Sequence, residues 1–288
     1  MEKFQIFIQL TRLNKPIGYL LLFWPCVWGL TLAFYYNREI NLYLEYIFLF
    51  FLGSVFMRSA GCIFNDIADR NFDKKVDRTK NRPIASQKIS VKRAIIYVII
   101  LCALAFLVLI NFNKLTIFMA ILSMPLAFTY PLMKRFTYWP QLFLGITFNY
   151  GLILAWISIN NEISIIPIIF YAGAIFWTLG YDTIYGYQDI KDDEIIGVKS
   201  TSIKFKNNPK KFILVCYLFF IATLIFLGFQ MNFKIFYYLF MMIPLTHLIL
   251  FQTNKLNINK PNDCLTKFKS NNFLGLIVFV NILIGKII

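Results

Sequence analysis

The sequence has few charged residues, one histidine (His247) and five scattered cysteines, and each shortage excludes a class of protein. Charged residues make up 15% of the 288 residues and hydrophobic residues 59%, whereas about 25% are charged in an ordinary soluble domain. A soluble domain of this length could not bury so much apolar surface, and the same composition excludes disorder. No two cysteines form a CxxC pair, which argues against disulfides and a zinc site. The composition indicates a polytopic membrane protein.

Long apolar runs divide the chain into membrane spans. A helix needs about 20 mostly apolar residues to cross a bilayer. Nine runs meet this requirement, and they predict an all-α bundle of nine transmembrane helices that forms a single domain over residues 1–288. The expected spans lie near residues 17–36, 42–64, 93–111, 114–133, 140–159, 163–181, 211–230, 233–252 and 271–288.

The basic residues lie almost entirely on one side of these spans. With nine spans, 24 of the 29 Lys and Arg residues fall on the side of the N-terminus, four fall on the other side, and Arg58 lies inside the second span. Loops rich in Lys and Arg stay in the cytoplasm, so the asymmetry predicts a cytoplasmic N-terminus. It also explains the net charge of +15 without nucleic-acid binding. A charge inside a span is costly and usually functional, which singles out Arg58.

A first group of carboxylates follows the second span. Residues 65–73 read Asn-Asp-Ile-Ala-Asp-Arg-Asn-Phe-Asp. If the helix of the second span continues, Asn65, Asp69 and Asp73 recur every four residues, and Asp66 precedes Asp73 by seven. Carboxylates on one stripe repel each other unless a cation neutralises them. Oxygen ligands of this kind suit Mg²⁺, which usually retains water and substrate phosphates as its other ligands.

A second group of carboxylates follows the sixth span, on the same predicted side of the membrane. Asp182, Asp189 and Asp193 are spaced by seven and four residues, so a continuous helix would place them on one face. Two such helical faces at the same depth in the membrane could bind one diphosphate between them through Mg²⁺ ions. The simpler alternative for either group is a solvated acidic loop, but two groups with similar spacing at span ends favour a site. A cation transporter would instead place its acids near the bilayer midplane.

Basic side chains adjoin both acidic segments and could complete an anion site. Arg binds phosphate oxygens in a bidentate manner and Lys acts as a point charge. Most of these residues reflect topology, but the short loop after the fourth span places Lys134 and Arg135 at the mouth of the bundle. The candidates are Arg78, Lys80, Arg82, Lys134, Arg135 and Lys199.

The two acidic segments resemble the aspartate motifs of the UbiA superfamily of intramembrane prenyltransferases. The similar stretches are Asn65-Asp66-x-x-Asp69-x-x-x-Asp73 and Asp189-x-x-x-Asp193. Further similarity lies in Arg12–Gly18 with Trp24-Pro25, in Arg78–Ile84, in Tyr130–Arg135, in Tyr181–Thr183 and in Gly197–Thr201. The similarity therefore extends from about residue 12 to residue 203. It is greatest to the branch that transfers polyprenyl chains to 4-hydroxybenzoate in ubiquinone synthesis.

The resemblance implies Mg²⁺-dependent transfer of a polyprenyl group from polyprenyl diphosphate to the carbon ortho to the hydroxyl of 4-hydroxybenzoate. It implies Mg²⁺ ligands at Asn65, Asp66, Asp69, Asp73, Asp189 and Asp193, of which Asp66, Asp69, Asp189 and Asp193 are the catalytic candidates. It implies diphosphate contacts from Lys134, Arg135, Arg78 and Lys199, and contacts with the aromatic substrate from Arg12, Tyr130 and Asp182.

The resemblance leaves the aromatic acceptor and the membrane open to alternatives. Related enzymes of the menaquinone and haem branches have similar motifs and use other acceptors. We expect a bacterial inner membrane rather than a mitochondrial one, because no Arg/Ser-rich segment precedes Thr11. The expected partners are the lipid bilayer and the two substrates, with no nucleic acid.

Overall fold

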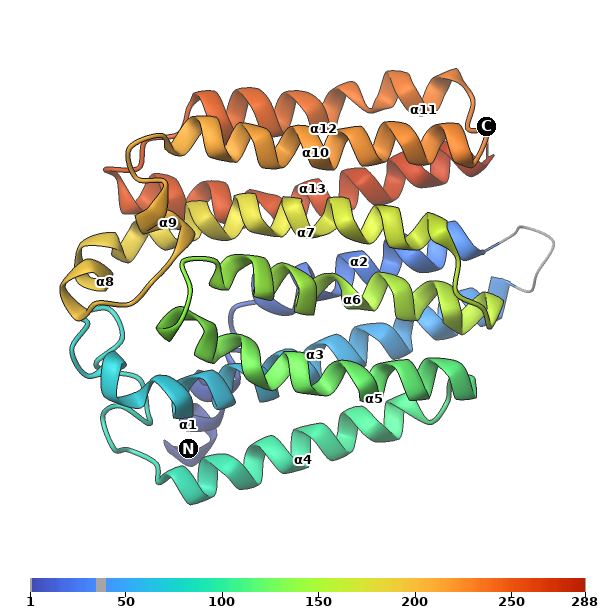
Figure 1. The fold of residues 1–288 in the computed structure, drawn as a ribbon. Helices are drawn as coiled ribbons and strands as arrows, with labels where there is room; N and C mark the ends of the chain where they lie inside the picture. The colour runs from blue at the N-terminus through green and yellow to red at the C-terminus, as the bar shows by residue number, and fades with distance from the viewer. Residues whose placement is uncertain (1, 35–39, 288) are drawn as a thin grey trace.

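The computed structural model describes residues 2–34 and 40–287, and every regular element in these ranges is a helix. The long helices run roughly antiparallel and form one bundle (Figure 1). Seven of them are single helices before residue 231: α2 (Ile17–Ala33), α3 (Ile40–Asp73), α4 (Val91–Leu109), α5 (Lys114–Thr129), α6 (Pro140–Asn160), α7 (Ile165–Gly186) and α10 (Pro209–Gln230). The next long element consists of three consecutive helices, α11 (Ile235–Phe240), α12 (Met242–Thr246) and the π-helix η3 (His247–Asn254). The last is α13 (Pro261–Ile287).

Shorter helices connect or precede the long ones at one end of the bundle. They are α1 (Glu2–Thr11), the 3₁₀ turns η1 (Tyr130–Arg135) and η2 (Tyr187–Asp189), α8 (Ile190–Ile196) and α9 (Thr201–Lys204). Side chains cap the N-termini of α4 and α5. Ser90 accepts a hydrogen bond from the backbone amide of Arg93, and Asn113 accepts one from the backbone amide of Thr116. Such caps satisfy amides that a helix start leaves without partners.

Within the described residues, eight helical segments are long and apolar enough to cross a membrane, and α2 is a ninth apolar helix of 17 residues. The expected all-α membrane bundle is confirmed. The last two residues of the expected span 17–36, and residue 288 of the expected span 271–288, lie outside the described ranges.

Two boundaries differ from the sequence prediction in ways that shape the site. Helix α3 continues to Asp73, beyond the expected end of its span at residue 64, so the acidic stripe is helical as the spacing required. The second acidic segment is not one helix: α7 ends at Gly186, and Asp189 and Asp193 follow in η2 and α8. The expectation that Asp182, Asp189 and Asp193 share one continuous helical face was therefore wrong.

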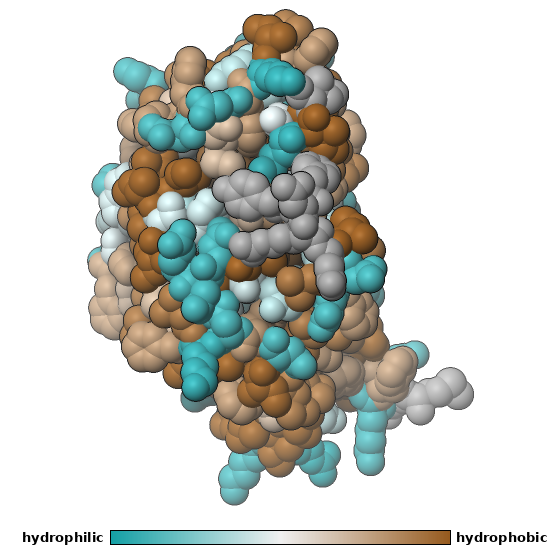
Figure 2. Space-filling model, turned by 90° about the vertical axis from the view of Figure 1, so that its right-hand side faces the viewer, coloured by the Kyte–Doolittle hydropathy of each residue, from teal (hydrophilic) through white to brown (hydrophobic). Residues whose placement is uncertain are grey.

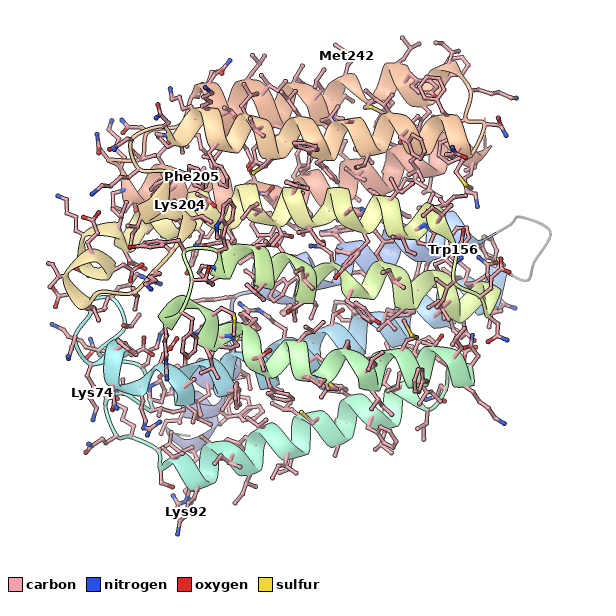
Figure 3. All side chains as sticks on the ribbon, viewed as in Figure 1. Lys74, Lys92, Trp156, Lys204, Phe205 and Met242 are labelled. Carbon is pink, nitrogen blue, oxygen red and sulfur yellow. The ribbon has the colours of Figure 1, made fainter. Side chains whose placement is uncertain are left out.

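The longer connecting segments, which contain the short helices, lie at the end of the bundle where the N-terminus lies, and the C-terminus lies at the other end (Figure 1). Lys74 and Lys92 project from the N-terminal end (Figure 3). The opposite end carries hydrophilic residues scattered among hydrophobic ones (Figure 2). This distribution follows the asymmetry of Lys and Arg in the sequence.

Aromatic rings join α2, α7 and α10 in the core. The Trp28 ring centroid lies 5.0 Å from that of Trp177 and 5.5 Å from that of Phe170. Helix α2 packs so closely on α6 that a Cβ added to Gly29 would lie 2.2 Å from the backbone oxygen of Leu152. This packing holds α2 against both α6 and α7.

Candidate active site

The acidic stripe of α3 separates into two groups by the direction of its side chains. Asn65, Asp69 and Asp73 line a polar cavity at the N-terminal end of the bundle, whereas Asp66 does not. The i, i+4, i+8 spacing places the first three on one face, and Asp66 lies about 100° away around the helix. All three aspartates are buried.

Asp66 is held between two arginines. Its Oδ1 accepts hydrogen bonds from Nη2 of Arg12 at 2.6 Å and from Nη1 of Arg82 at 3.1 Å. The same Arg82 nitrogen donates to Oδ2 of Asp73 at 2.9 Å. Arg12 adopts a φ of 56° between α1 and α2, a conformation that costs a non-glycine residue free energy and persists where its surroundings enforce it. Arg12 thus ties the start of the chain to α3.

Lys134 of η1 forms an ion pair with Asp69 through Oδ2. The other carboxylate oxygen, Oδ1, is buried and has no hydrogen-bond partner among the described residues. Arg135 points elsewhere: its Nη2 donates to the backbone oxygen of Ala68 at 2.6 Å, and its guanidinium lies 5.5 Å from the ring centroid of Phe72. Of the two basic residues of η1, only Lys134 lines the cavity.

The second acidic segment faces the first across the same cavity. Arg78 follows α3, and its Nε donates to Oδ1 of Asp189 at 2.7 Å and to Oδ2 at 2.9 Å. Its Nη1 also donates to the hydroxyl of Tyr185 at 3.3 Å. Burial lowers the pKa of Arg78, but its hydrogen bonds and charge interactions with Asp189 and Tyr185 together outweigh burial and hold the pKa above its ordinary value. Asp193 of α8 lies at the same cavity wall.

The polar cavity has a volume of about 250 Å³. It brings together most of the residues that the sequence singled out, although the two acidic segments are more than 100 positions apart in the chain. The predicted site residues that line it are Asn65, Asp69, Asp73, Arg78, Arg82, Tyr130, Lys134, Asp182, Asp189, Asp193 and Lys199. Arg12, Asp66, Lys80 and Arg135 are the predicted site residues that do not.

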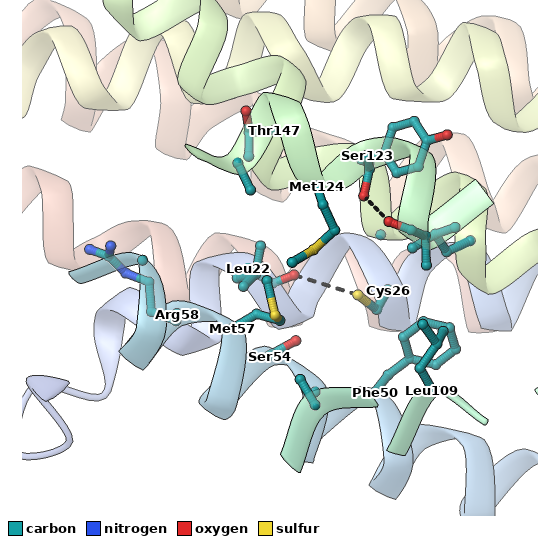
Figure 4. A pocket seen from close by; sticks show the side chains of 18 of the residues that line it. Leu22, Cys26, Phe50, Ser54, Met57, Arg58, Leu109, Ser123, Met124 and Thr147 are labelled. Carbon is teal, nitrogen blue, oxygen red and sulfur yellow. Dashed lines mark hydrogen bonds between the residues drawn. The ribbon is translucent and has the colours of Figure 1, made fainter. Parts of the chain in front are cut away.

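A second cavity, apolar and about 420 Å³ in volume, adjoins the polar one (Figure 4). Tyr130 lines both cavities, so the two meet at η1. The apolar cavity is walled by α2, α3, α4, α5 and α6. It extends along α3 from Gly61 to Leu49, a distance of about 18 Å at the helical rise per residue.

Among the described residues, Arg58 is the one basic residue that lines the apolar cavity. Its guanidinium lies 5.3 Å from the ring centroid of Phe148, and its Nε is buried without a hydrogen-bond partner in the described part of the chain. The Arg58 side chain packs against Gly18, because a Cβ on Gly18 would lie 2.9 Å from the Nε of Arg58. The sequence singled out Arg58 as a charge within a span but gave it no role. Tyr185, which the sequence prediction missed, precedes Asp189 by four residues and lines the polar cavity.

Basic side chains lie among the acidic residues of the expected metal site. Within residues 2–34 and 40–287, no three acidic, cysteine or histidine side chains lie close enough to enclose a metal ion. Instead, basic side chains neutralise Asp66, Asp69, Asp73 and Asp189. The residues nevertheless fit Mg²⁺, because the donors are all oxygens and the unpartnered Oδ1 of Asp69 belongs to a residue of the cavity wall.

The chain is similar in sequence to known proteins. Residues 22–278 match the model of the UbiA prenyltransferase family. Mitochondrial 4-hydroxybenzoate polyprenyltransferase of Bos taurus is 41% identical over 98% of this chain and 76% of its own length. 4-Hydroxybenzoate geranyltransferase 1 of Lithospermum erythrorhizon is 39% identical over 98% of this chain and 90% of its own length.

Solved structures share the fold. The apo structure of a UbiA homologue from Aeropyrum pernix K1 has a TM-score of 0.77 and 22% identity, and the match covers 93% of this chain and 97% of that one. A UbiA homologue from Archaeoglobus fulgidus bound to DMAPP and Mg²⁺ has a TM-score of 0.70 and 19% identity, over 96% of this chain and 99% of that one. At these identities the likeness concerns the fold.

Proposed function

Because this chain belongs to the UbiA prenyltransferase family, we propose that it transfers a polyprenyl group from polyprenyl diphosphate to 4-hydroxybenzoate, at the ring carbon ortho to the hydroxyl, in ubiquinone biosynthesis. One observation carries the proposal: a polar cavity lined by both acidic segments meets an apolar cavity at Tyr130. A prenyl diphosphate has a charged head and an apolar tail, and these two cavities offer one environment to each.

The polar cavity would hold the diphosphate with Mg²⁺. Asn65, Asp69 and Asp73 on α3, with Asp189 and Asp193 opposite, would be the ligands of the metal. When bound, Mg²⁺ supplies positive charge that offsets the charge of the diphosphate as it leaves. Asp66 has another role in this proposal, because it faces Arg12 and Arg82 rather than the cavity, and it would keep both arginines in place.

The basic residues of the cavity would exchange partners when substrate binds. Lys134 and Arg78 neutralise Asp69 and Asp189 in the structure. Once a metal ion neutralises these carboxylates, both basic side chains become available to the diphosphate oxygens. Lys199 lines the cavity and has no carboxylate partner among the residues that the structure describes, and its Nζ donates to the backbone oxygen of Phe136. It would bind the diphosphate directly.

Arg58 is the stronger candidate for the carboxylate of 4-hydroxybenzoate. Arg12 was expected there, but its guanidinium is bound to Asp66. Arg58 presents a buried Nε without a hydrogen-bond partner, next to Phe148 and near the junction of the cavities. A buried unpaired donor is costly, and a carboxylate ligand would remove that cost. Tyr130 and Asp182 would then contact the phenol.

The chemistry follows from this placement. The allylic C–O bond of the donor breaks, and its electron pair leaves with the diphosphate, where Lys134, Arg78 and Lys199 stabilise the developing charge. The ring carbon ortho to the hydroxyl attacks the allylic cation and then transfers its proton to the released diphosphate. The apolar walls exclude water, which would otherwise capture the cation. The ring of Tyr130, which lines both cavities, would stabilise it.

We further propose that the active-site end faces the cytoplasm in a bacterial inner membrane. The asymmetry of Lys and Arg supports the orientation, because the N-terminal segment and the connections on its side of the expected spans carry 24 of these 29 residues. Labelling of single cysteines introduced at residue 74 and at residue 234 in sealed vesicles tests this orientation.

The test of the function uses the purified protein in nanodiscs with geranyl diphosphate, 4-hydroxybenzoate and Mg²⁺. Mass spectrometry should detect 3-geranyl-4-hydroxybenzoate and free diphosphate. A naphthoate acceptor and haem, offered in parallel, separate this function from those of the related branches. Transfer to either of these acceptors and not to 4-hydroxybenzoate would refute the proposal.

A further inference from the structure

The last helix of the chain supports the second acidic segment. Helix α13 lies beside α7 and packs against η2, which belongs to that segment (Figure 1). Nε1 of the buried Trp28 on α2 donates a hydrogen bond to the backbone oxygen of Gly275 on α13 at 2.9 Å. Nε1 of the buried Trp177 on α7 donates one to Oδ1 of Asn271 on α13 at 2.8 Å. These two bonds fix α13 in the core relative to α2 and α7.

Phe268 connects α13 to the active site through Tyr185. The ring centroid of Phe268 lies 4.4 Å from that of Tyr185 and 5.8 Å from that of Tyr181, so Phe268 packs against the end of α7. Tyr185 is among the described residues that line the polar cavity, whereas Phe268 is not among those that line either cavity. Phe268 therefore contacts Tyr185 from behind the wall of the polar cavity.

Tyr185 in turn contacts Arg78. Its hydroxyl accepts a hydrogen bond from Nη1 of Arg78 at 3.3 Å, and the guanidinium carbon of Arg78 lies 5.7 Å from the centroid of its ring. The side chain of Arg78 is 42% exposed, so its surroundings restrain it only in part. In the proposed function a metal ion takes over Asp189, and Arg78 then keeps its contacts with Tyr185.

We propose that Phe268 is a positioning residue, which fixes the ring of Tyr185 and thereby holds the guanidinium of Arg78 in place to bind the diphosphate. Removal of the Phe268 ring would open a space behind Tyr185, into which the tyrosine ring could move and take its hydroxyl away from Arg78. Arg78 would then lose more rotamer freedom on binding a diphosphate oxygen. The inference rests on the proposed function, because it uses the diphosphate contact that is assigned there to Arg78.

The variant Phe268→Ala tests this role through the binding of pyrophosphate with Mg²⁺, measured by isothermal titration of the protein in nanodiscs. The Kd for pyrophosphate should rise by about five- to tenfold, which is part of the roughly 10- to 100-fold that a charged hydrogen bond supplies. In an Arg78→Met background the same substitution should change the Kd by less than about twofold, because no guanidinium remains to be positioned. An equal loss of affinity in both backgrounds, or no loss in either, would overturn the proposal.

Phe279→Ala is the matched control. Phe279 lies on the same helix, is partly buried like Phe268 and packs against Trp24, with 6.4 Å between the ring centroids. Its removal costs packing elsewhere in the bundle, so the Kd for pyrophosphate should stay within about twofold of the wild-type value. If Phe268→Ala does not assemble, Phe268→Val should show the same pattern with a rise of about threefold, because it opens a smaller space. A loss in Phe279→Ala as large as that in the Phe268 variant would contradict the proposal.

A second measurement depends neither on turnover nor on binding. Replacement of Tyr185 by 3-fluorotyrosine places one fluorine on the ring, whose ¹⁹F resonance reports how firmly the ring is held. The resonance should be narrow in the wild type and in Phe279→Ala, and broadened or split in Phe268→Ala. A resonance that Phe268→Ala leaves unchanged would overturn the proposal. Absence of geranyl transfer by the wild type would refute the proposed function instead, and the fluorine spectrum would still decide whether Phe268 fixes Tyr185.

Discussion

Replacement of Lys134 by Met should strengthen the binding of Mg²⁺ alone and weaken the binding of diphosphate. Lys134 is the ion-pair partner of Asp69, whose side chain is 2% exposed, whereas that of Lys134 is 27% exposed. Removal of one partner from a fully buried pair costs about 3–5 kcal/mol. Water reaches the lysine side, so we discount the cost to about 2 kcal/mol. The variant therefore carries an uncompensated carboxylate that a metal ion can neutralise.

The magnitude follows from this cost. In the wild type, Mg²⁺ has to displace Lys134 from Asp69, and in the variant it does not. A difference of about 2 kcal/mol corresponds to a Kd for Mg²⁺ that is lower by roughly 30-fold. The affinity for pyrophosphate in the presence of Mg²⁺ should fall by roughly 10- to 100-fold, because a charged hydrogen bond is lost.

Isothermal titration of the protein in nanodiscs measures both affinities. Lys199→Met is the matched control, because Lys199 lines the same cavity but donates to a backbone oxygen instead of a carboxylate. It should weaken pyrophosphate binding without any gain in Mg²⁺ affinity. Unchanged or weaker Mg²⁺ binding in Lys134→Met would refute the exchange of partners.

Three further predictions concern the metal ligands, the acceptor and the packing. Asp69→Asn and Asp189→Asn should each lower the kcat of geranyl transfer by at least about 1,000-fold while the protein still inserts into the membrane. EDTA should abolish geranyl transfer by the wild type, and added Mg²⁺ should restore it. A wild-type rate in either variant would show that its carboxylate is not a metal ligand. Arg58→Met should raise the KM for 4-hydroxybenzoate by roughly 10- to 100-fold and leave the KM for the donor unchanged; a change confined to the donor would contradict the assignment. Gly29→Ala should destabilise the bundle by about 1–3 kcal/mol, because the new methyl group would overlap the backbone oxygen of Leu152; an unchanged Tm would show that α2 and α6 can separate at no cost.

The sequence was informative wherever one local rule decides the outcome. Apolar runs of membrane length predicted the helices, because a bilayer leaves a spanning backbone few other ways to satisfy its hydrogen bonds. The spacing of Asn65, Asp69 and Asp73 predicted their common face once α3 continued past the membrane. The break after α7 was missed, because the turn at Gly186 and η2 depends on how the segment packs against α9, where a Cβ on Gly186 would lie 2.3 Å from the Ser202 hydroxyl oxygen.

Pairings between distant residues could not be predicted. Arg12 meets Asp66, and Arg78 meets Asp189, only because the bundle brings their helices together. The sequence placed Arg135 in the diphosphate site beside Lys134, but the tight 3₁₀ turn η1 points the two side chains to different partners. A run of basic residues predicts a positively charged region, and the backbone geometry decides which member of the run reaches the ligand.

The central claim is that both acidic segments bind one metal–diphosphate unit. Electron–nuclear double resonance of Mn²⁺, used in place of Mg²⁺ with pyrophosphate, measures the coupling between the metal and the ³¹P nuclei in the bound state. The account predicts a clear coupling in the wild type and its loss in Asp69→Asn and in Asp189→Asn alike. A coupling that persists unchanged in either variant would contradict it.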